Sequence, residues 1–197
     1  MKKSIFALVM ALVLCMSTFA MAETAPATFD FTAEEYVEGY TKFCSEVLGK
    51  DTTWSEPVET ENLIGVLATS VDMNDAIVYK MIDDPACVAM YAECKIGMSD
   101  SDMTEKSQAF GMTVAAIPFA TRYLEANFDA TALQSEVSEM EVACQELVQK
   151  VFTSDAITSA MTEPYTETAV IGGHNAEMTL EMNLEDMTLT ISFTYMP

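Results

Sequence analysis

The sequence predicts an α+β domain in which helices cover one face of an antiparallel sheet. Near the C-terminus, apolar residues alternate strictly with polar residues over 176–184 and again over 187–195. This period of two indicates strands with one buried face. Over 36–48 and 133–151, apolar residues instead recur every three or four positions, which indicates helices that pack on a core. Strands with one polar face are typical of antiparallel sheets, so we expect the helices on a single side.

The first predicted helix covers residues 32–48. Thr32 and Glu35 have the spacing of a capping box, in which each side chain accepts a bond from the other residue's backbone N–H. Phe31 and Tyr36 have the spacing of a hydrophobic staple. Gly49 provides the stop signal.

Between residues 52 and 86 the pattern predicts three extended segments separated by turns. The segments are 53–55, 63–71 and 76–82, with turns at 72–75 and 83–85. Pro57 cannot donate a ladder hydrogen bond, so the first segment is expected at an edge of the sheet.

Residues 87–96 allow two interpretations. The Asp84-Pro85 pair and several alanines favour a helix. The alternation of Val88, Met90 and Ala92 with polar neighbours favours a strand, and this is the interpretation that we prefer.

Two further helices are predicted, over 103–127 and over 131–152. Asp102 and Glu105 have the spacing of a second capping pair, and Pro118 is expected to kink or split the first of these helices. The second helix has one apolar face, made of Leu133, Val137, Met140, Cys144, Leu147, Val148 and Val151.

The last third of the chain predicts a three-stranded meander. The strict alternation described above gives a hairpin that turns at Glu185-Asp186. Residues 165–171, ended by Gly172-Gly173, form a third strand beside it. The predicted order is therefore one helix, three or four strands, two helices and three strands.

The N-terminus has the pattern of a secretory signal peptide over residues 1–22. Lys2 and Lys3 precede an uncharged apolar run, and Ala20-Met21-Ala22 has the small residues of a cleavage site. An uncleaved membrane anchor is the alternative. We expect a flexible leader over 23–30, a single domain over 31–197, and a location that is secreted or in the cell envelope.

The net charge of the chain limits the classes of partner that we expect it to bind. Removal of residues 1–22 takes away two of the nine basic residues and none of the 31 acidic ones, so the net charge falls from −22 to −24 over 175 residues. Nucleic acids and anionic membrane surfaces require basic residues, so neither is expected as a partner. Cationic partners, Ca²⁺ included, remain compatible with this charge.

No catalytic set is evident in the sequence. His174 is the single histidine and follows two glycines in a predicted hairpin loop. A Ser-His-acid or Cys-His site would have to use it, but no Gly-x-Ser-x-Gly motif accompanies it. Zinc is not expected with one histidine and no Cys-x-x-Cys motif, and we predict no catalytic, cofactor or metal residues.

Four cysteines follow the predicted cleavage site, and their state is open. Two disulfides with three connectivities, or four buried free thiols, are both compatible with an exported chain of this size. Cys44 and Cys144 lie on apolar helix faces and could pair if those helices are neighbours. The four are Cys44, Cys87, Cys94 and Cys144.

Two acidic fragments resemble parts of calcium loops. Residues 72–75 and 100–102 lack the glycine and the closing glutamate of such loops, so turn and cap formation is the preferred interpretation. Met178, Met182 and Met187 could suggest copper, but their alternation predicts core packing.

These features together favour a secreted, non-enzymatic interaction or ligand-binding domain whose partner is an unknown protein or small molecule. Two alternatives are kept. One is an extracellular hydrolase built on two converging carboxylates, one of them with a raised pKa. The other is an envelope protein stabilised by Ca²⁺.

Overall fold

The computed structural model describes residues 27–60, 62–70, 72–97 and 100–197. Its centre is an eight-stranded antiparallel sheet, and helices pack on this sheet. The strands are β1 (Thr52–Trp54), β2 (Val58–Glu59), β3 (Leu63–Ser70), β4 (Ala76–Met81), β5 (Cys87–Gly97), β6 (Tyr165–Ile171), β7 (His174–Asn183) and β8 (Thr188–Met196). The helices are α2 (Ala33–Glu46), α3 (Met103–Glu125), α4 (Ala130–Leu133), α5 (Val137–Val151) and α6 (Ser154–Ala160).

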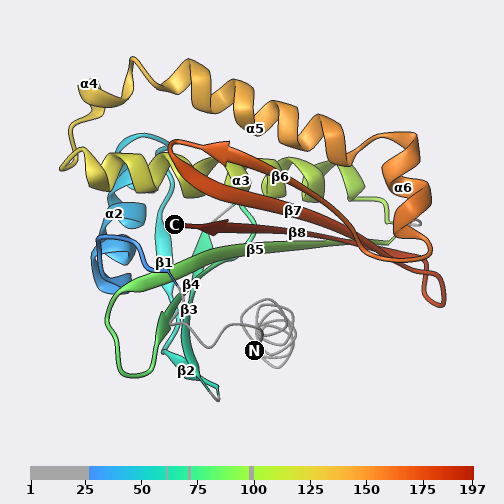
Figure 1. Cartoon of the computed structure of the whole chain (residues 1–197), viewed down its shortest axis with the longest axis horizontal. Coiled ribbons are helices and arrows are strands. Elements are labelled where there is room, and N and C mark those ends of the chain that lie inside the picture. Colours follow the sequence, from blue (N-terminus) through green and yellow to red (C-terminus); the bar gives the residue numbers. More distant parts are fainter. Residues whose placement is uncertain (1–26, 61, 71, 98–99) are drawn as a thin grey trace.

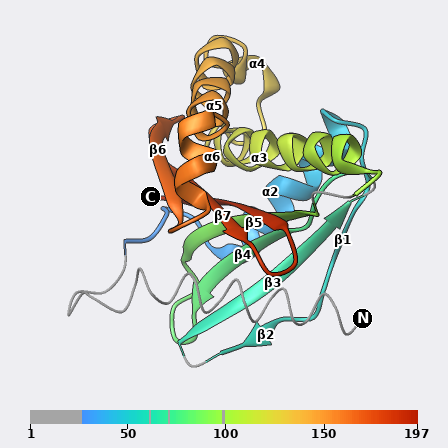
Figure 2. The ribbon, with the colours of Figure 1, turned by 90° about the vertical axis from the view of Figure 1, so that its right-hand side faces the viewer.

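The strands follow the order β1-β3-β4-β5-β8-β7-β6, with β2 also paired to β3. Helices α2 and α3 pack over β4 and β5, and α5 packs over β6 and β7, all on the same side of the sheet (Figures 1 and 2). The predicted α+β class and the antiparallel sheet with helices on it are therefore confirmed.

Helix α2 begins as its sequence predicts. The Thr32 N–H donates to Glu35 Oε2 at 2.7 Å, and the Glu35 N–H donates to Thr32 Oγ1 at 3.1 Å, which completes the capping box. The rings of Phe31 and Tyr36 stack with centroids 5.9 Å apart, as the staple requires. Gly49 adopts a φ of 64° just beyond the helix, a conformation that favours glycine.

Residues 87–97 form strand β5, so the strand interpretation is confirmed. Tyr79 pairs with Ala89 while Lys80 pairs with Cys87, which makes Val88 the additional residue of a β-bulge. The bulge turns Cys87 toward the helices. It explains why the alternation over 87–96 is imperfect at its start.

Helix α3 departs from two expectations. It continues without a break across Pro118, so the predicted split does not occur. Asp102 occupies the cap position but makes no capping hydrogen bond, so the predicted capping pair with Glu105 is wrong. The Asp102 carboxylate lies 3.3 Å from Lys106 Nζ instead, one turn further along the helix.

The helix predicted over 131–152 is interrupted. A turn separates the short helix α4 from α5, and Arg122 on α3 holds this turn through two hydrogen bonds of 2.9 Å to the Glu136 carboxylate. Helix α6 was not predicted. The Thr153 hydroxyl caps it by accepting from the Ala156 N–H at 3.2 Å, and Thr153-Ser154-Asp155 was the local signal for it.

The C-terminal meander is confirmed, with one correction at the hairpin turn. Met178, Leu180, Ile191 and Phe193 are buried toward the helices, as the alternation predicts. Leu184 and the following Met187 are exposed, because the turn occupies residues 184–187 rather than two residues. The alternation thus continues in the sequence beyond the point at which pairing ends.

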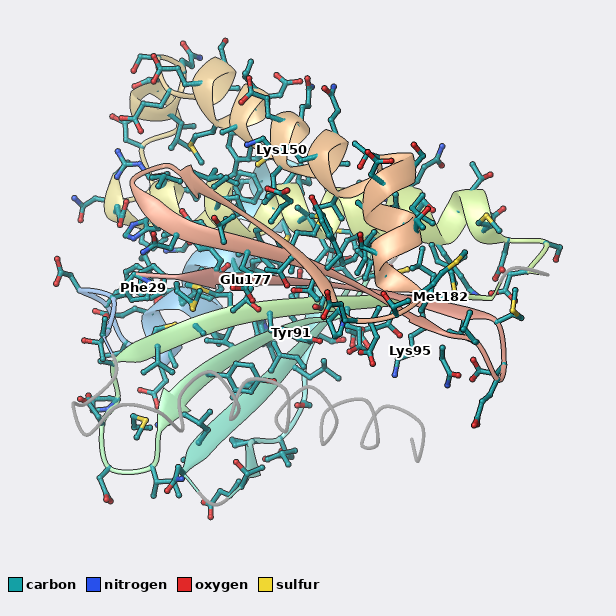
Figure 3. The ribbon with its side chains drawn as sticks, turned by 45° about the vertical axis from the view of Figure 1, so that its right-hand side comes forward. Phe29, Tyr91, Lys95, Lys150, Glu177 and Met182 are labelled. Atoms are coloured by element: carbon teal, nitrogen blue, oxygen red, sulfur yellow. The ribbon has the colours of Figure 1, made fainter. Side chains whose placement is uncertain are left out.

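The sheet carries apolar residues on both faces at one end, which was not expected. A second, smaller cluster lies on the side away from the helices, over β3, β4 and β5, and is made of Leu63, Ile77, Tyr79, Val88, Ala89 and Tyr91. The same face is mostly polar over β6, β7 and β8, where Val170 of β6 and Met196 of β8 are the apolar exceptions. Thr194 of β8 pairs with Tyr91 of β5 on one side and with Glu177 of β7 on the other. This row of side chains across the sheet therefore begins with an aromatic residue and ends with an acidic one (Figure 3). The expected single polar face therefore holds only for the C-terminal strands.

The predicted signal peptide over residues 1–22 lies outside the described residues. Part of the predicted flexible leader is described, and here Phe29 is buried. Its backbone N–H donates to the Cys87 carbonyl at 2.8 Å, and its ring lies 4.9 Å from the rings of Phe31 and His174. The chain is thus anchored to the sheet three residues before Thr32, the residue that caps α2.

Candidate functional site

His174, the candidate for acid–base chemistry, begins β7 and connects three parts of the fold. Its Nε2 atom lies 2.8 Å from Glu125 Oε1 at the end of α3. Its ring packs on Phe29 and forms an edge contact with Tyr195, with centroids 4.9 Å and 5.6 Å apart. The Tyr195 hydroxyl donates to the Ile171 carbonyl at 2.7 Å. It is therefore not placed as a nucleophile that the His174 imidazole could activate. These contacts indicate a structural role.

Glu125 also belongs to an ion-pair network with Arg122. Burial of Glu125 opposes its ionisation, but hydrogen bonds from His174 and Arg122 outweigh this and lower the pKa of the carboxyl group. Arg122 reaches Glu125 and Glu136 together, which raises the pKa of its guanidinium group. The network fixes the end of α3 to β7 and to the start of α5.

The acidic fragments that resemble calcium loops are used for local structure. Asn74 donates from its side chain to the Glu93 carbonyl at 2.8 Å, and the Thr113 hydroxyl of α3 donates to the Asn74 carbonyl at 2.9 Å. Asp100 accepts from the Gly97 N–H at 2.9 Å and from Lys106 at 2.5 Å. Among the described residues, no group of three or more His, Cys, Asp or Glu side chains is placed to hold a metal ion.

The candidate copper methionines do not form a cluster. Met178 is buried in the core, Met182 is buried nearby, and Met187 is exposed in the hairpin turn. Core packing therefore accounts for the first two. The prediction that Met187 is in the core is wrong, because the turn begins before it.

Cys44, Cys87, Cys94 and Cys144 are free thiols, and all four are buried. Burial raises the pKa of Cys87 to about 12 and of Cys144 to about 11. These thiols are therefore protonated and act as small apolar residues in the core.

Glu177 is the one carboxyl group whose pKa is raised among the described acids with a resolved shift. Burial on the sheet face away from the helices is the cause. Its strand neighbours on that face are Thr168 and Thr194, which are not acids. A pair of converging carboxylates of the kind that a glycosidase uses is thus not assembled around Glu177.

The feature best suited to a ligand is an apolar groove between the helices. The cavity has a volume of about 500 Å³, within the size range of small-molecule sites. We call it the helix groove. It is lined by ten apolar residues and one amide, namely Phe43, Val47, Leu48, Met112, Ala115, Ala116, Phe119, Ala130, Leu133, Gln134 and Val137.

Close helix packing builds one wall of the helix groove. A Cβ atom at Gly39 of α2 would lie 3.1 Å from Leu124 Cβ of α3, so this glycine lets the two helices approach. One turn further along α2, the rings of Phe43 and Phe119 stack with centroids 6.4 Å apart and an interplanar angle of 9°. These two rings form the aromatic side of the cavity.

The opposite wall is formed by α4 and the start of α5. Asn127 and Phe128 both have positive φ values, 52° and 64°, so the chain turns sharply at the end of α3. Asp129 then caps α4 by accepting from the Thr131 N–H at 2.9 Å. The interruption between α4 and α5 described above leaves Ala130 and Leu133 facing the cavity.

The helix groove is open to solvent along an apolar edge. Val47 is 49% exposed and Met112 is 36% exposed, although both are large apolar residues. Ala115 and Ala116 line the groove with small side chains, which leave space in it. Exposed apolar lining of this kind is typical of a binding site rather than of a closed core.

Comparisons with family models, with curated proteins and with solved structures found no match for this chain. Within residues 27–197, leaving aside the few positions not described, none of the helices combines the length and hydropathy that crossing a bilayer requires.

Proposed function

We propose that this protein is a non-enzymatic binding protein whose helix groove holds the apolar part of a small molecule. The observation that carries the proposal is the cavity of about 500 Å³ with ten apolar lining residues and a single amide, Gln134. Such a site gains affinity mainly from burial of apolar surface, at about 25 cal/mol per Å². One amide at the rim orients a ligand but supplies no acid, base or nucleophile.

We propose further that binding occurs outside the cytoplasm. The support for this is the signal-peptide pattern of residues 1–22 and the strongly acidic composition of the remaining chain. The contacts of the two candidate groups do not favour a hydrolase. His174 is hydrogen-bonded to Glu125 and packed on aromatic rings, and the cross-strand neighbours of Glu177 are threonines rather than a second acid.

Titration with N-phenyl-1-naphthylamine, an uncharged dye that fluoresces in apolar sites, tests the proposal. We expect saturable binding of one equivalent of dye by the purified protein. At a dye concentration about 100 times the Kd, binding to the native state adds about 2.7 kcal/mol of stability. For a domain of this size that raises the Tm by roughly 5–11 °C.

Two variants that fill the helix groove locate the site. Ala115→Trp places an indole in the cavity, and Val47→Trp covers its exposed edge, where folding tolerates a larger side chain. Both should weaken dye binding at least tenfold. The matched control is Gln108→Trp, on an exposed position of α3 outside the lining. Unchanged dye binding in both groove variants, with native circular dichroism, would exclude the groove, and no binding by the parent protein would refute the proposal.

A further inference from the structure

We infer that the ligand of the helix groove carries a positive charge, so that it is a cationic amphiphile with an apolar body and an ammonium head group. This inference rests on the proposed function. The apolar body fits the lining described above. The head group would lie at the end of the groove where Phe43 meets Tyr123, beside two carboxylates that we call the acidic rim, Glu46 and Asp129.

Tyr123 lies close to both carboxylates of the acidic rim and to the aromatic side of the groove. Its hydroxyl donates to Glu46 Oε2 at 2.6 Å. Its ring lies 6.1 Å from the Phe43 ring, which lines the groove, and makes an edge contact with Phe128 at 5.6 Å. The bond to Glu46, with burial and the nearby charges of Glu46 and Asp129, raises the pKa of Tyr123 to about 12. Both carboxylates therefore lie close to the same end of the groove, and both residues are exposed.

A cation is already bound to an aromatic ring at this end. Lys42 Nζ lies 3.8 Å above the centre of the Phe128 ring and 2.8 Å from Glu38 Oε1. An ammonium group on an aromatic face beside a carboxylate is a favourable arrangement. Because Glu38 neutralises Lys42, the carboxylates of Glu46 and Asp129 leave a net negative charge at this end, which suits the ammonium group of a ligand.

An anionic head group would have to compete with a carboxylate for a cation at this end of the groove, because Lys42 already pairs with Glu38. Of the seven basic side chains in residues 27–197, six pair with carboxylates, and none of the seven lines the helix groove. The seventh, Lys150 (Figure 3), lies in the last turn of α5, whereas Val137, the residue of α5 that lines the groove, begins this helix. The chain as a whole has a net charge of −22, which repels anions from the groove.

Three ligands with the same decyl chain test the inference by displacing N-phenyl-1-naphthylamine below their micelle concentrations. They are decyltrimethylammonium, decyl glucoside and decyl sulfate. Two exposed ion pairs predict that the cation binds about two- to thirtyfold more tightly than the neutral glucoside, with the sulfate weakest. Salt at 1 M screens charges beyond about 3 Å and should bring the three affinities close together.

Two conservative variants assign the effect to the acidic rim. Glu46→Gln keeps an acceptor for the Tyr123 hydroxyl, and Asp129→Asn keeps a residue that caps helices well. Each should lower the affinity for the cation by a factor of about 1.4 to 5 and leave the affinity for the glucoside unchanged. Glu163→Gln, which removes an exposed charge beyond the far end of α5, should change neither.

The outcomes separate the inference from the proposed function. If the dye binds but the three decyl ligands show equal affinities, if the sulfate binds best, or if none displaces the dye, the inference is wrong and the binding function stands. The same holds if Glu163→Gln acts as strongly as the rim variants. If the dye itself does not bind, the proposed function fails first.

Discussion

Replacing Leu147 by alanine tests whether α5 packs on the sheet as described. The Leu147 side chain is 0% exposed and lies on the face of α5 that contacts β6 and β7. Leucine to alanine removes the equivalent of three methylene groups, about 2.4 kcal/mol of transfer free energy at roughly 0.8 kcal/mol each. The cavity left behind adds to this loss, which gives a total of about 3–4 kcal/mol.

Urea unfolding followed by circular dichroism measures this change in the free energy of unfolding. The corresponding fall in Tm is about 6–16 °C for a domain of this size. Val142→Ala is the matched control, because Val142 is 53% exposed on the same helix and should cost less than about 0.5 kcal/mol. A loss below about 1 kcal/mol for Leu147→Ala, with an unchanged dependence on urea, would show that α5 is not packed there. The wall of the helix groove that Val137 contributes would then lose its support.

Two further predictions follow from titratable groups. The pKa of Glu125 is lower in the folded protein than its ordinary value of 4.5, so on acidification this carboxyl group is protonated first in the unfolded state. The free energy of unfolding should therefore fall as the pH drops below 4.5. His174→Leu should reduce this acid-dependent loss relative to the parent protein, and identical pH profiles of unfolding would argue against the network. Thiol reagents at pH 8 should label the four core cysteines only after unfolding, because burial keeps them protonated. Rapid labelling of the native protein, or fewer than four reactive thiols after unfolding without a reductant, would contradict this.

The sequence predicted most of the strands because alternation is a local signal. Residues 176–183 and 188–195 alternate strictly, and both form strands whose buried side chains are the predicted ones. The turn between them was misplaced because Leu184 and Met187 continue the alternation after pairing has stopped. Only the backbone geometry, with a φ of 54° at Met187, marks the turn.

Interactions between distant residues account for what sequence reasoning missed. The break between α4 and α5 is held by Glu136 bonding to Arg122 on another helix, and no periodicity reports such a contact. Likewise, the alternation over 87–96 grouped Tyr91 with the polar positions, and no pattern assigned Ile77 or Tyr79 to a second buried face. All three are buried on the face opposite to the helices.

The helix groove was not predicted, although part of its signal is present in the sequence. Residues 109–120 are apolar on all sides, and a helix of this kind is usually buried all round. Met112 and Ala115 instead lie on the side of α3 that faces the groove, where α2, α4 and α5 leave space. That space depends on how Gly39 seats α2 on α3 and on the sharp turn at Phe128. Neither can be derived from residue periods alone.

The position of β8 in the sheet has a consequence for the timing of folding. The strand that comes last along the chain lies in the middle, between β5 and β7, where Met90 pairs with Tyr195. Of the eight strands, β8 is synthesised last. β5 therefore gains its second neighbour only after the other seven strands have been synthesised. Contacts between such remote segments form slowly. The sheet is therefore complete only after residues 188–196 have paired with both β5 and β7.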